Sequence, residues 1–162
     1  MAANFETAAG GGELLGFDSD IYTTQTSTTA AIDARMTTKP QQTSGTEIMT
    51  VTITPTASSS TLLINSTIMV APGGDGYKVS AFLFRDSTAD ALVFGQNMMQ
   101  SAGEFELVTL QTAVSAASTS STTFKVRWAA HTGQTAWINR GSSQATGGGS
   151  LTTSLWVMEI GA

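Results

Sequence analysis

The feature that most constrains this chain is a pair of alternating segments within residues 46–71. In the first segment, threonines alternate with three apolar residues, Met49, Val51 and Ile53. A repeat of two residues is typical of a half-buried β-strand, because successive side chains point to opposite faces. Pro55 cannot donate to a sheet and a serine run follows it, so a connection is expected before the second alternation begins at Leu62. The stretch therefore predicts two strands and an all-β chain.

The rest of the chain repeats this pattern at intervals of roughly ten residues. Alternation predicts further strands at residues 77–85, 91–100, 105–110, 122–130, 135–140 and 151–160. Gly133 lies in a short turn, residues 131–134, which we interpret as a hairpin. No window has helical periodicity. A total of about eight strands predicts an antiparallel two-sheet β-sandwich, most simply jelly-roll-like.

The first 39 residues differ from the remainder. They are rich in glycine and threonine, with apolar residues only at intervals, and such a segment does not form a core alone. Pro40 forces extended geometry on the residue before it and marks the start of the main domain. We therefore predict an extended N-terminal anchoring arm over residues 1–39 and a β-sandwich domain over residues 40–162.

Composition and charge exclude several classes of function. Only 12% of the residues are charged, and the net charge is −5, which would repel a phosphate backbone. There are no cysteines, and no apolar run is long enough for a membrane span. The first residues have no basic region followed by an apolar core, so we expect no signal peptide. Neither nucleic acid nor a membrane is expected as a partner.

Catalytic and metal-binding patterns are also missing from the sequence. His131 is the single histidine and falls in a predicted turn, where an exposed turn residue is the default interpretation. Asp86, Asp90 and the nearby Asp75 could suggest calcium, but residues 86–90 lack the glycine and the bidentate glutamate of a calcium loop. Glu104 and Glu106 share one strand face, which is more often solvated than catalytic. We expect no enzyme activity, no metal and no cofactor.

Several aromatic residues allow more than one interpretation. Trp128 alternates with the core face and is expected in the core. Trp137 and Trp156 could form a sugar-stacking platform or part of a subunit interface, and we favour the interface because an outward apolar residue is usual there. In the strand at 77–85, Phe82 and Phe84 face opposite to the other apolar residues. That pattern indicates a central strand, or a face covered by another subunit.

Several phrases along the chain resemble one family. They are PQQTSGTE at 40–47, ITP at 53–55, LFRDSTADAL at 83–92, TTFKVR at 122–127, INR at 138–140 and VMEI at 157–160. Together they resemble a β-sandwich domain of virion proteins of tailed bacteriophages, found in tail-fibre-like and head-surface proteins. The resemblance covers about residues 40–160 and depends on the order and spacing of phrases that are each weak alone.

This resemblance implies a structural virion protein that forms a homotrimer and has no catalytic residues. The short arm favours a capsid decoration (cement) protein on the capsid surface, docked on the major capsid protein or another virion protein. The anchoring residues would be Phe5, Leu14, Leu15, Phe17, Ile21 and Tyr22. The trimer interface would include Phe82, Phe84, Trp137 and Trp156. The alternative is a tail-fibre or head-fibre module that binds host surface glycans.

Overall fold

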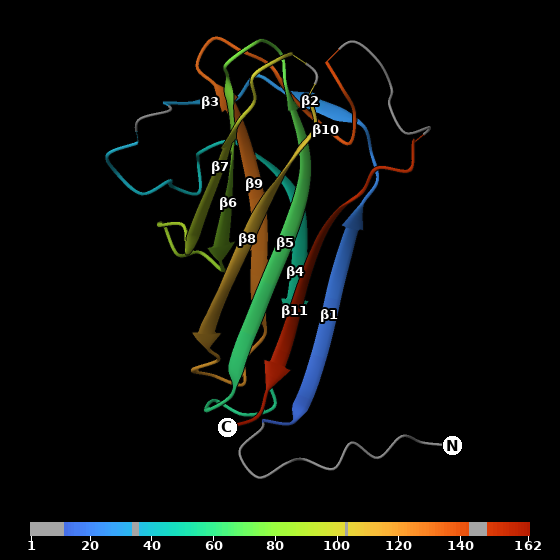
Figure 1. The fold of residues 1–162 in the computed structure, drawn as a ribbon. Helices are drawn as coiled ribbons and strands as arrows, with labels where there is room; N and C mark the ends of the chain where they lie inside the picture. The colour runs from blue at the N-terminus through green and yellow to red at the C-terminus, as the bar shows by residue number, and fades with distance from the viewer. Residues whose placement is uncertain (1–11, 34–35, 103, 143–148) are drawn as a thin grey trace.

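The computed structural model describes residues 12–33, 36–102, 104–142 and 149–162, and these residues form β-strands and loops without an α-helix (Figure 1). The strands are β1 (Leu14–Tyr22), β2 (Thr26–Thr28), β3 (Ala31–Ile32), β4 (Thr46–Ile53), β5 (Thr61–Pro72), β6 (Lys78–Arg85), β7 (Val93–Met98), β8 (Glu106–Ser115), β9 (Thr122–His131), β10 (Ala136–Ile138) and β11 (Thr153–Ile160).

The strands form two sheets packed face to face. Sheet A has the order β1-β11-β5-β10-β2, and β8 pairs with the other edge of β5. The length of β5 allows β11 to pair with its first part and β10 with its end. Sheet B has the order β3-β9-β6-β7, and β4 also pairs with β9. All pairs are antiparallel except β3 with β9. The predicted all-β, two-sheet, jelly-roll-like sandwich is confirmed.

The core lies between the two sheets and follows from the alternation in sequence. Apolar side chains of β5 such as Ile64 and Ile68 are buried against the inward side chains of β9, including Trp128, which is fully buried as predicted. Burial of one such aliphatic side chain stabilises the fold by about 1.5–3 kcal/mol. The alternation therefore fixes which face of each strand is turned inward.

Two predictions about connectivity are wrong. The turn at residues 131–134 exists, with Gly133 at φ 78° and a hydrogen bond from the Gln134 N–H to the His131 carbonyl. However, β9 belongs to sheet B and β10 to sheet A, so this turn crosses between sheets instead of closing a hairpin. Strand β8 also continues to Ser115, beyond the predicted end at residue 110.

The N-terminal region is part of the sandwich from Leu14 onward. β1 pairs antiparallel with β11 along its length and forms the edge of sheet A (Figure 1). β2 and β3 also join the sheets. Most of residues 14–32 therefore lies in sheet strands, and the expected boundary at residue 40 does not separate an arm from the domain in this part of the chain. Phe5 lies outside the described residues.

Candidate protein–protein interface

The register of sheet A determines which residues share its solvent side. Residues directly opposite each other on neighbouring strands point to the same face. Since the even-numbered positions of β5 from Leu62 to Val70 are turned inward, the odd-numbered ones are turned out. Following the pairings from β5 gives the outer face of sheet A: Phe17, Ser19 and Ile21 of β1, Ser154, Trp156 and Met158 of β11, Leu63, Asn65, Thr67 and Met69 of β5, and Leu107, Thr109, Gln111 and Ala113 of β8.

The outer face of sheet A is uncharged at all of these positions and apolar at most of them. Phe17, Ile21 and Leu107 are large apolar side chains with 58%, 63% and 48% of their surface exposed. The solvent side of sheet B differs, because it carries charged residues such as Lys125 of β9, and an ion pair joins Arg127 to Glu47 at 3.2 Å. An exposed apolar area of this extent on one face is typical of a surface that contacts another molecule.

A groove of about 320 Å³ lies in the middle of this face. Leu63 and Ala113 border it on one side, and Trp156, Asn65 and Gln111 supply its polar atoms. The indole and the two amides make no side-chain hydrogen bond with any described residue. The groove therefore offers unpaired donors and acceptors within an apolar surface.

Residues from both predicted sets lie on this face. Phe17 and Ile21, predicted as anchors, are on β1, and Trp156, predicted at an interface, pairs through its backbone with Ser19 beside them. Trp137 of β10 lies toward one end of the same sheet, and the guanidinium of Arg140 covers its ring at 4.4 Å from the centroid. That contact occupies one face of the Trp137 ring, which a stacked sugar would need.

The other predicted anchors have different surroundings. Leu14 is 57% exposed at the start of β1, whereas Leu15 is half-buried next to Gly161. Tyr22 packs against the core, and its carbonyl accepts a 2.7 Å hydrogen bond from the buried amide of Asn139. Thr153 donates to the same amide at 3.0 Å, so this polar contact fixes the end of β1 to the rest of sheet A.

Phe82 and Phe84 are fully buried within the chain itself. They form a small cluster with Ala91 and Ala129, against which Ile32 and Met36 also pack. Because neither ring has exposed surface, neither can contact a second copy in this arrangement, and the proposed interface does not include them. The two side chains face away from the main core, as the alternation indicates, and a segment of the same chain covers them there.

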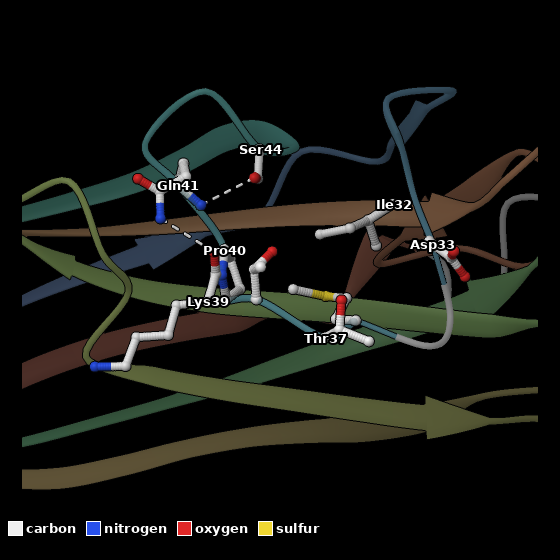
Figure 2. A pocket seen from close by; sticks show the side chains of 9 residues that line it. Ile32, Asp33, Thr37, Lys39, Pro40, Gln41 and Ser44 are labelled. Carbon is white, nitrogen blue, oxygen red and sulfur yellow. Dashed lines mark hydrogen bonds between the residues drawn. The ribbon is translucent and has the colours of Figure 1, made fainter.

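A pocket of about 250 Å³ lies within that covering segment, between residues 32 and 44 (Figure 2). Its polar groups are already used. The Gln41 N–H donates to the Ser44 hydroxyl, and the Gln41 side chain donates to the Lys39 carbonyl and to Asp90 at 2.7 Å. These bonds hold the segment in place over Phe82, so we do not assign the pocket a ligand.

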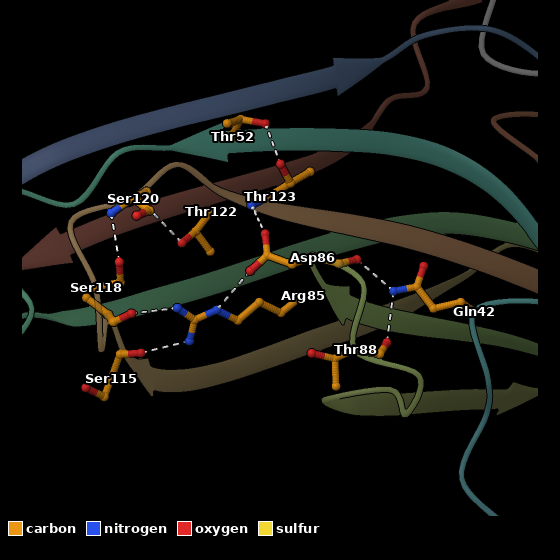
Figure 3. Close-up of polar contacts among 11 residues, drawn as sticks. Gln42, Thr52, Arg85, Asp86, Thr88, Ser115, Ser118, Ser120, Thr122 and Thr123 are labelled. Carbon is orange, nitrogen blue, oxygen red and sulfur yellow. Dashed lines mark hydrogen bonds and ion pairs between the residues drawn. The ribbon is translucent and has the colours of Figure 1, made fainter.

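The remaining candidate residues for chemistry have structural roles. His131 is half-buried and meets the Tyr77 ring edge-on at 5.2 Å. The Asp86 carboxylate accepts the Thr123 N–H at 2.7 Å (Figure 3), and Asp75 and Glu104 accept backbone N–H groups of nearby turns. Among the described residues no three histidine or acidic side chains gather as metal ligands. No helix in the described part of the chain could span a membrane.

Glu159 is the unusual titratable group of the sandwich. It faces inward on β11 and is 1% exposed. Burial would raise the pKa of its carboxyl, but hydrogen bonds from the Thr56 N–H at 2.8 Å, the Ala57 N–H and the Thr56 hydroxyl outweigh this and hold the pKa below its usual value. The ionised carboxylate therefore joins β11 to the connection between β4 and β5, which is a structural role.

Comparison with known protein families assigns the chain to one of them. Residues 25–159 match the family described as the Pgp3 C-terminal domain. The chain belongs to this family. Pgp3 C-terminal domains are non-enzymatic and typically form trimers. The comparison with curated proteins gave no match.

Solved structures with a similar fold are distant in sequence. The Eiger TNF of S. frugiperda has 10% identity and a TM-score of 0.49, with 90% of this chain and 94% of that chain covered. The sugar-binding C-terminal domain of EclA has 16% identity and a TM-score of 0.36, with 83% and 86% covered. A structure of infectious bursal disease virus, Gx strain, has 14% identity and a TM-score of 0.36, with 88% and 36% covered.

Membership of the Pgp3 C-terminal domain family overturns the predicted virion role. Pgp3 is a plasmid-encoded, secreted virulence protein of Chlamydia, and nothing in this match connects the chain to a phage. The resemblance to phage virion proteins was wrong, and so were the functions drawn from it. The chain is neither a capsid decoration protein nor a fibre module. The predicted location on a virion and the predicted capsid partner, which both followed from that role, are therefore not retained.

Sequence reasoning missed most of the outer face of sheet A. Leu63, Met69 and Met158 were not predicted at an interface, nor were Asn65 and Gln111 in the groove. A signal was present, because β5 carries apolar residues on both sides of its alternation at Leu63 and Met69. The pairing of β5 with β8 and β11, which joins these positions into one surface, is not visible in the sequence.

Proposed function

We propose that this chain is a non-enzymatic binding domain that assembles as a homotrimer through the outer face of sheet A. The observation that carries the proposal is the uncharged, apolar character of this face in a chain with a net charge of −5. Copies of an acidic chain repel each other, and contact through an uncharged face avoids placing like charges together. The buried centres of protein interfaces are likewise depleted in charged residues.

The extent of the face favours a second protein chain over a small substrate. It spans four strands from β1 to β8, and its exposed apolar residues lie on both edges, at Phe17 and Leu107. In a cyclic trimer each copy presents the same face toward one axis, so all three apolar faces become covered together. The trimers typical of Pgp3 C-terminal domains support this stoichiometry.

In this proposal, residues that the sequence predicted as anchors and residues that it predicted at an interface have the same role, which is contact between copies. Phe17, Ile21 and Trp156 would contact the neighbouring copy, and Leu14 would extend the contact at the start of β1. With the apolar face used for assembly, the solvent side of sheet B and the loops remain available for other partners. The secreted virulence role of Pgp3 supports a binding function of this kind outside the producing cell.

Introduction of charge into the face tests the proposal. We expect the wild-type chain to be trimeric by light scattering coupled to size-exclusion chromatography, and Phe17→Glu and Trp156→Glu to give folded monomers. The matched control is Met98→Glu, which makes the same change at an exposed apolar residue of β7 in sheet B, 51% exposed, and should remain trimeric. A monomeric wild-type chain, or face variants that stay trimeric, would refute the assembly through this face.

A further inference from the structure

A row of polar side chains that ends in two amides crosses the centre of the uncharged face. Trp156 of β11, Asn65 of β5 and Gln111 of β8 are direct neighbours in the sheet register. On one side lies the row Phe17, Met158, Leu63 and Ala113, and on the other the row Ile21, Ser154, Thr67 and Thr109. The two amides and the indole therefore lie where a partner would cover them most completely.

The side chain of Asn65 is largely covered, but its amide atoms still reach solvent and have no protein partner among the described residues. Asn65 is 8% exposed, and its amide makes no hydrogen bond with the described residues. Gln111 lies directly opposite and is exposed, and its amide has no partner either. The two amides therefore have only solvent as a partner in the isolated chain, and an interface that covered them would have to supply other partners, because polar groups buried without hydrogen bonds are costly.

From this arrangement we infer that the amides of Asn65 and Gln111 hydrogen-bond to the adjacent copy and fix the number and register of subunits in the trimer. The inference rests on the proposed assembly through the same face. An amide has both donors and an acceptor, so identical copies around a rotation axis satisfy one another, each donating to one neighbour and accepting from the other. A single buried polar layer in an apolar interface specifies register and oligomer state in this way.

A second copy of the chain fits the groove better than a small polar ligand does. Exposed apolar residues lie on both sides of the polar row and need to be covered as well, and a small molecule in a groove of about 320 Å³ would leave Phe17 and Ile21 exposed. The absence of charge across the defined face also removes the usual means of holding an ionic ligand. Apolar and polar rows are covered together only by another protein surface, and the family trimer supplies one.

Apolar replacements of the two amides, in the full chain, test the inference. Gln111→Leu changes an exposed residue and should leave the fold intact, while Asn65→Leu replaces the buried amide with a side chain of similar size. Thr67→Val is the matched control, because it removes a hydroxyl from the same strand and face outside the groove. Native mass spectrometry would measure the distribution of oligomers, and circular dichroism would check the fold.

We expect the wild-type chain and Thr67→Val to give one trimeric species. In Gln111→Leu the trimer should fall to about half of the protein or less, with other assemblies taking its place. The reason is that the apolar contacts between subunits remain, whereas the hydrogen bonds that specify their register are lost. Asn65→Leu should lower the fraction of trimer in the same way. If Asn65→Leu does not fold, the result for Gln111→Leu alone tests the inference. A trimer unchanged in Gln111→Leu would overturn the inference while leaving the proposed function standing, whereas a monomeric wild-type chain would overturn both.

Discussion

At the scale of single residues, Glu159 shows how a charge can be buried without weakening the fold. Its position on β11 alternates with Leu155 and Val157, which are core residues, so the pattern alone would call for another apolar side chain. The connection after β4 turns its Thr56 and Ala57 N–H groups toward the carboxylate. These donors lie in a partly exposed connection at the end of the core, and the negative charge accepts from both of them.

The lowered pKa of Glu159 predicts how stability depends on pH. A carboxyl whose pKa is lower in the folded state than in the unfolded state stabilises the fold above the unfolded value, about 4.3, and this contribution is lost as the pH falls through the folded value. Glu159→Gln removes it. We expect the melting temperature of the variant to be lower than wild type at about pH 7 and the difference to shrink at about pH 3. Equal differences at both pH values would contradict this role.

At the scale of elements, the two sheets are joined by specific polar contacts as well as by the core. Arg85 at the end of β6 in sheet B donates to the carbonyls of Ser115 and Ala116 at 2.9 and 2.6 Å, just where β8 of sheet A ends (Figure 3). Its Nε also lies 3.6 Å from Asp86. The planar guanidinium can reach both carbonyls at once, which a lysine could not do in the same geometry.

Removing this contact should weaken the sandwich without affecting the apolar face. We expect Arg85→Ala to lower the free energy of unfolding by about 2–3 kcal/mol, since hydrogen bonds to charged groups contribute about 1.5–3 kcal/mol. Arg85→Lys should recover only part of the loss. Lys125→Ala, at the register neighbour of Phe84 on β9, is the control and should change stability little. Chemical denaturation measures the free energy of unfolding of all three variants. A free energy equal to that of the wild type in Arg85→Ala would show that Arg85 does not stabilise the contact between the sheets.

The same elements explain how far the sequence could be interpreted. Alternation predicted β4, β5 and β9 closely, because each has one strongly apolar face. It did not show that β1 belongs to the sheet, since Gly16 and the two aspartates of β1 break the pattern on an edge strand. It also could not tell whether the turn after His131 joins neighbours in one sheet or crosses between two, because turn residues specify local geometry and not the sheet.

The phrases behind the phage resemblance have a physical basis in the fold. Residues 40–47 and 83–92 lie against each other, for example through Gln42, whose amide donates to the carbonyls of Asp86 and Thr88 at 2.8 and 2.9 Å (Figure 3). The Ala91 N–H also donates to the Pro40 carbonyl. These residues stabilise a covering segment on sheet B, so they carry information about a β-sandwich. They carry none about what the sandwich binds, and a fold shared by unrelated proteins does not determine function.

At the scale of the whole molecule, the candidate interface arises only when four strands from separate parts of the chain lie side by side. Phe17 and Trp156 are far apart in sequence and meet through the pairing of β1 with β11. Trp156 was recognised from sequence because it alternates with Leu155 and Val157 and so faces outward, where an apolar residue is usual at a subunit interface. Asn65 and Gln111 were not, because an amide in a threonine-rich strand is ordinary until the pairing of the neighbouring strands places it at the centre of a face.

Assembly through this face also predicts that stability depends on protein concentration. If folding is linked to trimer formation, mass action favours the folded, associated state as concentration rises, because the unfolded chain does not bind. We expect the melting temperature of the wild-type chain to increase with concentration, and that of the monomeric Phe17→Glu variant to stay constant. Met98→Glu should follow the wild-type chain, because its substitution lies on sheet B. Calorimetry over a wide concentration range measures this, and a wild-type melting temperature independent of concentration would indicate that the sandwich is stable without its neighbours.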